Sequence, residues 1–384
     1  MFVAIRTESM WHLTLMKNTD SISSSPKKRA HHRNLAPVGI IFALLGLLLF
    51  AYFVKKAGLT EITAGIGRLG AGFVLILAIS SIRHIVRSIA WIKCFEPPFS
   101  LRFRDALAAR IMGDALGNII PLASMAVSEP SKAVFVKDRV PLMVGLSALA
   151  VENIFYSLSV AIFIFSGTAT LLLTFSLPKP LRYASLGALA TTLVIMPLGY
   201  FLIRRQWRFL SGTLGLLGNR GIARNWMTKM MPRADTLEQR IYGFYERNQA
   251  AFLSIFALEL VFHLAGVIEI YATLTYISPI APTLLTAFIL ESVNRIINVA
   301  FKFVPLRTGV DEAGTGMLSK VLGFTTTIGV TLAIVRKGRD IFWAMIGVAL
   351  LLHKGFSLRH VEEDAAKSVK DARSTGDLAT DEHR

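Results

Sequence analysis

Residues 141–168 read PLMVGLSALAVENIFYSLSVAIFIFSGT, and this stretch decides the fold class of the chain. Glu152 is its only charged side chain. A helix of about 20 mostly apolar residues crosses the hydrocarbon core of a bilayer, and this stretch exceeds that length. It predicts a transmembrane helix with one carboxylate near its middle, where a charge is costly and is therefore a candidate for function.

Apolar stretches recur along the chain and predict an all-α, polytopic helical membrane protein. The other clear spans lie at 36–54, 71–94, 182–203 and 250–277, and a sixth, at 323–353, is interrupted by charged residues. Of the 384 residues, 53% are hydrophobic and 17% are charged, so lipid is the solvent for most of the chain. We predict about six full spans.

Two further stretches, 101–138 and 284–320, are apolar but punctuated by proline, glycine and charged residues. Each reads as a helix, a Pro-Leu break and a second short helix, with the breaks at Pro121 and Pro305. Irregular backbone at membrane depth is tolerated only where protein or water covers it. These stretches favour two re-entrant helix pairs, with full crossings as the alternative.

The net charge of +17 comes largely from basic residues in short loops. In a soluble protein this charge would point to nucleic acid, but it follows the rule that short cytoplasmic loops are rich in lysine and arginine. We therefore expect no nucleic-acid partner. The loop after the fourth span is the clearest case, with Arg204, Arg205, Arg208, Arg220, Arg224, Lys229, Arg233, Arg240 and Arg247. We predict a multi-pass protein of the cell (inner) membrane with this loop and both termini in the cytoplasm.

This pattern divides the chain into five segments. They are a basic cytoplasmic N-terminal segment 1–34, a first membrane half 35–203, a basic cytoplasmic loop 204–248, a second membrane half 249–354 and a polar C-terminal tail 355–384. The first 33 residues lack the apolar core of a signal peptide. We expect them to be a basic anchor and not a cleaved leader.

The two membrane halves resemble each other as repeats. A shift of 184 residues places Pro98 on Pro282, Pro121 on Pro305, Gly145 on Gly329 and Glu152 on Arg336, and a one-residue gap places Glu129 on Glu312. The segment before the first broken stretch is basic whereas residues 277–285 carry no charge, so the two stretches should begin on opposite sides. These matches suggest an inverted repeat, as in transporters with a site near the bilayer midplane. Glu152 and Arg336 would then form a buried pair across the halves if they are close, either as a gate or as a structural contact.

Charged side chains inside the apolar stretches are the candidate site, since a charge at the bilayer centre costs roughly 2.5 to 3.5 kcal/mol on insertion scales. The cations expected to bind an anionic lipid headgroup are Lys132, Arg295, Arg307 and Arg336. The carboxylates expected to be their partners, or a gate, are Asp114, Glu129, Glu152, Glu291, Asp311 and Glu312. The unpaired backbone groups of a broken helix, with arginine beside them, can hold such an anion. The alternative is that these charges only hold the breaks in place.

Two more pairs of polar residues lie four positions apart. Arg83 and Arg87 share a helix face, and the alternative for them is to extend toward cytoplasmic headgroups. Glu259 and His263 could relay a proton, although a membrane histidine is more often a packing residue. The single cysteine, Cys94, offers neither an internal disulfide nor a metal-ligand cluster. Because the sequence also lacks a Walker lysine motif and the common hydrolase motifs, we expect no cofactor, no metal and no enzyme activity.

Five short motifs in these regions are similar to those of the lysylphosphatidylglycerol synthase membrane-region family, also described as a flippase-like membrane domain. They are Ser88-Ile-Ala-Trp-Ile92, Gly117-Asn-Ile-Ile-Pro-Leu122, Ser128-Glu-Pro-Ser-Lys132, Val151-Glu-Asn-Ile154 and Val304-Pro-Leu-Arg-Thr-Gly-Val-Asp-Glu312. The resemblance covers roughly residues 38–353 and implies a lipid-translocating module with two re-entrant helix pairs, with relatives beside hopanoid and isoprenoid lipid genes.

The chain departs from the family pattern at two positions. Ser128-Glu-Pro-Ser-Lys132 stands where the family usually has Gly-Glu-x-x-Arg, and Asn153 replaces the arginine of a Glu-Arg pair. A lysyl transferase would also need a soluble aminoacyl-transfer domain, whereas about thirty polar residues follow Lys354. We therefore expect no lysyl transfer.

Three functional hypotheses remain. The first is a flippase-like protein that binds a polar or anionic lipid headgroup between the re-entrant pairs and moves it between leaflets, with exchange of charge partners as the switch. The second is a membrane scaffold that recruits a lipid-modifying or lipid-biosynthesis enzyme. The third, a membrane-embedded enzyme with Asp311 and Glu312 as acid and base, is the weakest, because adjacent carboxylates on one short helix point in different directions. The lipid, the energy source and the oligomeric state stay open.

Overall fold

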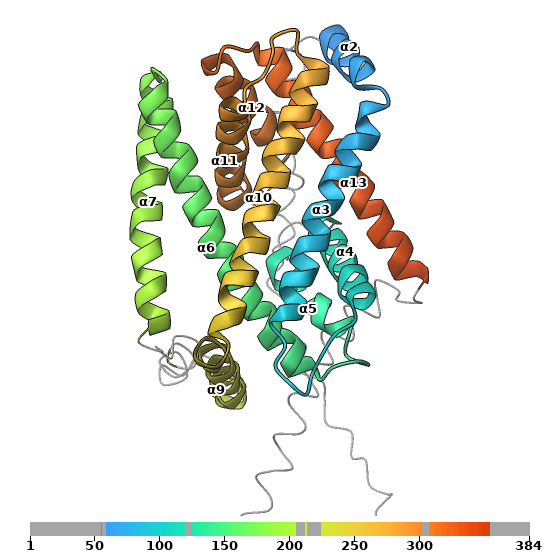
Figure 1. Ribbon diagram of the computed structural model, residues 1–384, viewed down its shortest axis with the longest axis vertical. Coiled ribbons are helices and arrows are strands. Elements are labelled where there is room, and N and C mark those ends of the chain that lie inside the picture. The colour runs from blue at the N-terminus through green and yellow to red at the C-terminus, as the bar shows by residue number, and fades with distance from the viewer. Residues whose placement is uncertain are drawn as a thin grey trace, which may run out of the picture. The chain divides into compact units, whose positions relative to one another are not determined.

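A computed structural model describes residues 55, 59–119, 124–204, 212, 224–301, 304 and 307–353, which all belong to one compact unit, Val38–Arg384. Every regular element among these residues is an α-helix (Figure 1). In chain order the helices are α2 (Leu59–Leu69), α3 (Gly72–Lys93), α4 (Phe103–Ile119), α5 (Ser124–Val134), α6 (Leu142–Thr174), α7 (Lys179–Arg204), α9 (Arg224–Arg247), α10 (Gln249–Ile277), α11 (Leu284–Ala300), α12 (Val310–Val321) and α13 (Thr326–His353). The predicted all-α class is confirmed.

Four of the described helices are long and apolar enough to cross a membrane, and they match four predicted spans. Their apolar segments are Gly72–Lys93 in α3, Leu142–Thr174 in α6, Lys179–Leu198 in α7 and Ala251–Ile277 in α10. The predicted span 323–353 forms one continuous helix, α13, which carries four charges between Arg336 and Asp340. The predicted span 36–54 lies outside the described residues. The chain is thus a multi-pass membrane protein.

The two predicted broken stretches each contain a pair of short helices, α4 with α5 and α11 with α12. The members of each pair contact each other. At 1.5 Å per residue, α4 and α11 are about 26 Å long and α5 and α12 about 17 Å, which is less than the roughly 30 Å of a bilayer's hydrocarbon core. Each of them is thus shorter than the mean thickness of that core. Pro121 and Pro305, the predicted break residues, lie outside the described residues.

Four helices of each membrane half follow the same order and make corresponding contacts. Thr326 begins α13 184 residues after Leu142 begins α6, which is the shift found in the sequence. The helices correspond as α3 with α10, α4 with α11, α5 with α12 and α6 with α13. Their packing corresponds as well, because α4 packs against α13 as α11 packs against α6, and α3 contacts α4 as α10 contacts α11.

The equivalent helices α3 and α10 pack side by side in opposite directions (Figure 1). At one end Gly72, the first residue of α3, lies against Tyr276 near the end of α10. At the other end Arg247, just before α10, pairs with Glu96, just after α3. The chain therefore reaches the two broken pairs from opposite ends, and the repeat is inverted.

Apolar side chains form two cores, one around each broken pair. On α6 the first core ends at Phe155 and the second begins at Phe163, and on α10 the boundary falls between Leu258 and Val267. Polar side chains occupy the stretches in between, which we call the polar layer. Its members are Arg83, His84 and Arg87 on α3, Ser159 on α6, Glu259 and His263 on α10, and Arg336, Lys337, Arg339 and Asp340 on α13.

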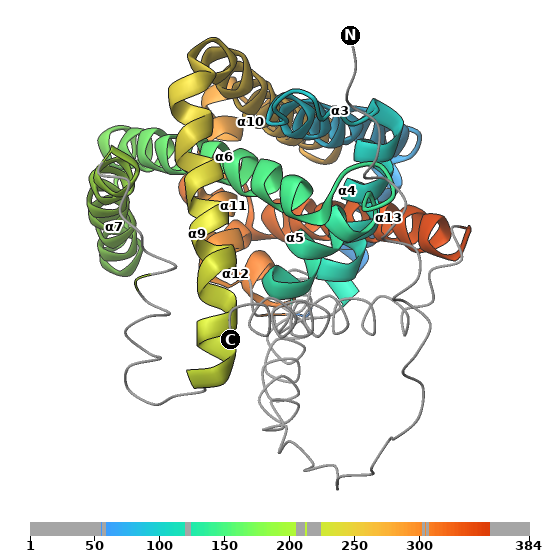
Figure 2. The ribbon, with the colours of Figure 1, turned by 90° about the horizontal axis from the view of Figure 1, so that it is seen from below.

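The predicted basic loop 204–248 contains a helix, α9, that the charge pattern did not predict. It runs across the ends of the spanning helices (Figure 2) and contacts α6 and α10. Its Ile241 and Phe244 side chains pack against the first core. Burial of this apolar edge holds a largely basic helix at the end of the bundle.

Candidate functional site

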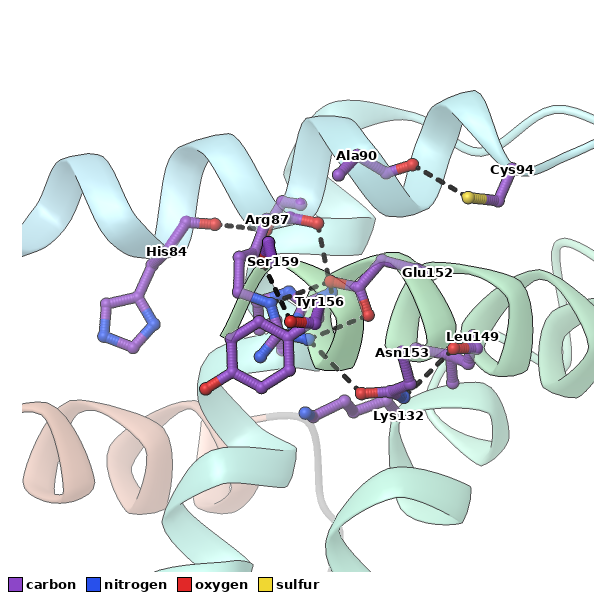
Figure 3. Close-up of polar contacts among 12 residues, drawn as sticks. His84, Arg87, Ala90, Cys94, Lys132, Leu149, Glu152, Asn153, Tyr156 and Ser159 are labelled. Carbon is purple, nitrogen blue, oxygen red and sulfur yellow. Dashed lines mark hydrogen bonds and ion pairs between the residues drawn. The ribbon is translucent and has the colours of Figure 1, made fainter. Parts of the chain in front are cut away.

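The carboxylate of Glu152 is the centre of a buried cluster in the first half (Figure 3). Arg87 of α3 donates two hydrogen bonds to it, from Nε to Oε1 at 2.8 Å and from Nη2 to Oε2 at 2.9 Å. Arg110 of α4 donates a third, from Nη2 to Oε1 at 3.1 Å. The ring of Tyr156 lies 3.8 Å from the Arg87 guanidinium carbon, a cation–π contact that covers it. Glu152 is fully buried.

Asn153 joins this arrangement to the broken pair α4–α5. Its Oδ1 accepts from Arg87 Nη2 at 3.3 Å, and its Nδ2 donates to Glu129 Oε2 at 3.0 Å. The Lys132 Nζ lies 2.8 Å from Glu129 Oε1 and 2.8 Å from Asp114 Oδ1. The structure thus brings together four of the predicted site residues, Asp114, Glu129, Lys132 and Glu152, with the residues that bond to them. We call this set the first cluster: Arg87, Arg110, Asp114, Glu129, Lys132, Glu152 and Asn153.

In the second half, α12 presents two adjacent carboxylates to α13. Asp311 Oδ1 lies 3.2 Å from Arg336 Nη2, and Glu312 forms an ion pair with Lys337. The second Glu312 oxygen accepts the backbone N–H of Gly309 at 2.7 Å, which caps the start of α12. The two carboxylates face different partners, as adjacent residues on one helix should.

A chain of ion pairs continues along α13. Arg307 Nη2 lies 3.0 Å from Asp340 Oδ2, and Arg339 Nη2 lies 2.7 Å from Asp340 Oδ1. Arg339 also pairs with Glu269 of α10, which lies 3.4 Å from Nη1 of Arg83 on α3. We call this set the second cluster: Arg83, Glu269, Arg307, Asp311, Glu312, Arg336, Lys337, Arg339 and Asp340.

The remaining predicted pair, Glu291 and Arg295, lies on α11 and is buried. The two side chains form an ion pair one helical turn apart. The guanidinium carbons of Arg295 and Arg83 lie 4.8 Å and 4.7 Å from the centre of the Phe262 ring. The same aromatic ring therefore offers a cation–π contact to both arginines.

The structure corrects the expected pairing of Glu152 with Arg336. Glu152 is bonded to Arg87 and Arg110 within its own half, and Arg336 is bonded to Asp311. Each charge meets an opposite charge on a helix of its own half, so neither needs a partner in the other half.

Two other expectations about these charges also change. Glu312 pairs with Lys337 and not with any of the four cations expected to bind the headgroup. Arg83 and Arg87 pair with buried carboxylates, so they do not extend toward headgroups.

Arg307 has an unusual backbone. Its φ is 51°, in the left-handed region that residues other than glycine rarely adopt. Such a conformation costs of order 1–3 kcal/mol and persists where the surroundings impose it, often at functional sites. Here it directs the guanidinium to Asp340 of α13.

Some members of the clusters were not predicted from the sequence as site residues. Arg110 and Glu269 lie inside predicted apolar stretches, and Lys337, Arg339 and Asp340 interrupt the last one. The cost of a charge at membrane depth is the signal that could have found them. Among the described residues, no group of three or more histidine, cysteine or acidic side chains is placed to hold a metal ion.

The family described as the lysylphosphatidylglycerol synthase TM region matches residues 36–347. The match includes both broken pairs and every member of both clusters. No curated protein and no solved structure matches the chain. On the strength of the family match, which covers most of its length, the chain belongs to the lysylphosphatidylglycerol synthase TM region family.

Proposed function

We propose that this protein binds the headgroup of a polar or anionic lipid among its buried charges and moves the lipid between the leaflets of the cell membrane. The observation that carries the proposal is a set of nine cations and eight carboxylates that pair with one another inside the described membrane region. The cations are Arg83, Arg87, Arg110, Lys132, Arg295, Arg307, Arg336, Lys337 and Arg339. The carboxylates are Asp114, Glu129, Glu152, Glu269, Glu291, Asp311, Glu312 and Asp340. We call these seventeen side chains the ion-pair network.

Stability alone does not account for this network. Replacing a buried ion pair by apolar residues of similar volume is often neutral or stabilising, because the desolvation cost offsets the attraction. Charged residues inside membrane segments therefore usually mark a substrate or ion path. Seventeen such side chains, all of them paired, support a substrate that is itself charged.

The network is most exposed where the broken pairs contribute to it. Asp114 and Glu129 are 36% and 30% exposed, and the Arg307–Asp340 pair is about one fifth exposed. Glu152 and Glu312, by contrast, are fully buried. A headgroup that arrives at either broken pair would find charges accessible to it and would meet further charges inside.

Exchange of partners would keep a moving lipid phosphate paired with a cation at each step. Each of the four cations expected to bind the headgroup already holds at least one carboxylate: Lys132 holds Asp114 and Glu129, Arg295 holds Glu291, Arg307 holds Asp340 and Arg336 holds Asp311. A phosphate and a carboxylate make similar charge-assisted hydrogen bonds to arginine. The incoming phosphate could therefore replace a carboxylate on one of these cations, and the released carboxylate would pair with a neighbouring cation or bind a proton.

The test is leaflet exchange of fluorescent phosphatidylglycerol and phosphatidylcholine in liposomes that contain the intact protein. The informative variant is Arg307→Gln with Asp340→Asn, which removes both charges of an accessible pair. The matched control, Arg247→Gln with Glu96→Gln, removes a pair outside the network. We expect the wild type and the control to exchange phosphatidylglycerol much faster than protein-free liposomes do. The first variant should exchange it at least about tenfold more slowly than the wild type. Absence of exchange by the wild type, or unchanged exchange by the first variant, would contradict the proposal.

The placement of α9 favours a second candidate function, a scaffold for a lipid-biosynthesis enzyme. This basic helix lies across one end of the bundle (Figure 2), where the charge bias predicts the cytoplasm. Under the scaffold function, replacing Arg224, Lys229 and Arg233 by glutamine would abolish co-purification of the enzyme and leave leaflet exchange unchanged. If the same variant instead lost leaflet exchange, the scaffold would lose its support.

A further inference from the structure

One carboxylate in the polar layer stands apart from the ion-pair network. Glu259 of α10 is fully buried, yet neither of its carboxyl oxygens has a hydrogen-bond partner among the described residues. Each of the eight carboxylates in the network has a cation within 4.0 Å. Glu259 is therefore the exception that the pairing scheme does not explain.

The groups around Glu259 are already engaged with one another. The charges that act on it most strongly are Arg87, Glu152, Arg110 and Arg295, from α3, α6, α4 and α11. The helices packed against α10 also bring Arg83 on α3, Glu291 on α11 and Arg336, Arg339 and Asp340 on α13, while α10 itself carries His263 and Glu269. Two further helices contact α10. Arg68 lies on α2, and Glu238, Arg240 and Tyr242 lie on α9.

An ionised carboxylate without a hydrogen-bond donor is costly to bury, and it avoids the cost by binding a proton. His263 lies one turn further along the same face of α10. One of its ring nitrogens is 3.1 Å from Ser159 Oγ, and the other has no hydrogen-bond partner in the described region. The polar layer thus contains two groups that can exchange protons, placed between the two apolar cores.

A proton on Glu259 changes the balance of charge in this region. The ion-pair network has nine cations and eight carboxylates, so it carries one surplus positive charge. An ionised Glu259 cancels that surplus, and a protonated Glu259 leaves it uncompensated. One proton at this position therefore decides whether the described network and Glu259 together are neutral or carry a charge of +1.

We propose that Glu259 is a proton-binding site and that a proton bound there is coupled to the binding of a lipid with one net negative charge. The lipid supplies the charge that neutral Glu259 no longer supplies, so proton and lipid together leave the interior neutral. A zwitterionic lipid brings no net charge and needs no proton. The inference rests on the proposed lipid binding and adds to it the charge class of the substrate and a coupling ion.

Linkage makes the proposal measurable, because a lipid that favours protonated Glu259 must draw a proton from solution when it binds. Short-chain phosphatidylglycerol is added to the intact protein in weakly buffered detergent solution with a pH indicator, near the pH at which Glu259 is half-protonated. At that pH half of the Glu259 side chains already carry the proton, so we expect uptake of up to about half a proton per bound lipid, and none with phosphatidylcholine. The variant Glu259→Gln, which mimics the protonated side chain, should bind phosphatidylglycerol without proton uptake. The matched control Glu96→Gln, at a partly exposed glutamate outside the network, should behave as the wild type.

The pH dependence of affinity gives a second readout that needs only the wild-type protein. Protonated Glu259 is the binding form, so affinity is full at low pH and falls by up to about tenfold per pH unit once Glu259 ionises. Phosphatidylglycerol binding without proton uptake and without this pH dependence would overturn the coupling and leave lipid binding intact. If the wild type binds no phosphatidylglycerol, both the coupling and the proposed function fail.

Discussion

The two halves of the membrane region place a buried charge at equivalent positions but with opposite signs. In the first half Glu152 of α6 is held by two arginines, from α3 and α4. In the second half Arg336 of α13 is held by Asp311 of α12. The inverted repeat therefore preserves a buried charge on its long helix and not the sign of that charge.

One ion pair of the described network connects the two halves. Among the ion pairs of the described network, Arg83 with Glu269 is the one that links α3 of the first half to α10 of the second. All the others lie within one half. Movement of one half against the other, the mode used by many transporters built from inverted repeats, would thus separate few opposite charges.

The largest effect is expected from removing the central carboxylate. Glu152→Gln leaves Arg87 and Arg110 buried without a countercharge, and breaking such an arrangement should lower the free energy of unfolding by about 5 kcal/mol. Thermal unfolding of the purified protein in detergent measures the change. A loss below about 1 kcal/mol would mean that Glu152 does not hold the first cluster together.

The equivalent change in the second half should be milder. Arg336→Met strands a single carboxylate, Asp311, which keeps the hydroxyl of Thr315 at 3.3 Å, so we expect a loss of about 3 kcal/mol. The same unfolding assay compares the two variants directly. If Arg336→Met lost more stability than Glu152→Gln, the number of charges left without a partner would not explain the two losses.

A pair of equivalent glycines compares the packing of the two halves. A Cβ on Gly329 would lie 2.6 Å from the carbonyl oxygen of Thr315 and 2.7 Å from Cα of Gly316, whereas one on Gly145 would meet Ala133 Cβ at 3.3 Å. Backbone cannot yield as a side chain can, so Gly329→Ala should cost about 2 kcal/mol. Gly145→Ala should change stability by less than about 1 kcal/mol. Equal losses in unfolding assays would show that the α5–α6 contact is as tight as the α12–α13 contact.

The contact between the halves can be weakened on its own. Arg83→Met removes a cation from Glu269, but Arg339 remains paired with that carboxylate, so we expect a stability loss of only about 1 kcal/mol. If the halves move against each other during transport, leaflet exchange should become faster in this variant. Slower exchange with unchanged stability would instead place Arg83 among the groups that bind the headgroup.

The smallest effect belongs to the pair outside the network. Glu96→Gln weakens its contact with Arg247, which is 60% exposed, and exposed pairs contribute roughly 0 to 1 kcal/mol. Its unfolding temperature should match that of the wild type. A large loss would mean that the end of the bundle near α9 depends on this pair more than its exposure indicates.

The sequence alone determined the class of the protein and the places where the chain crosses or breaks. Length and hydropathy are local properties, so the spans in α3, α6, α7 and α10 follow from runs of apolar residues. Proline and polar residues marked the broken pairs, and the distribution of basic residues indicated opposite orientations for the halves. The charged candidates followed from the cost of a charge in lipid.

Only the tertiary structure decided which cation pairs with which carboxylate. Arg87 and Glu152 are 65 positions apart, and Arg339 and Glu269 are 70 apart, so no local pattern encodes these contacts. The sequence suggested that Glu152 and Arg336 would pair if they were close, because they occupy equivalent positions in the repeat. An inverted repeat can nevertheless place equivalent residues in separate surroundings. The isolation of Glu259 is likewise invisible in the sequence. Whether a buried carboxylate is paired depends on helices that meet only when the chain has folded.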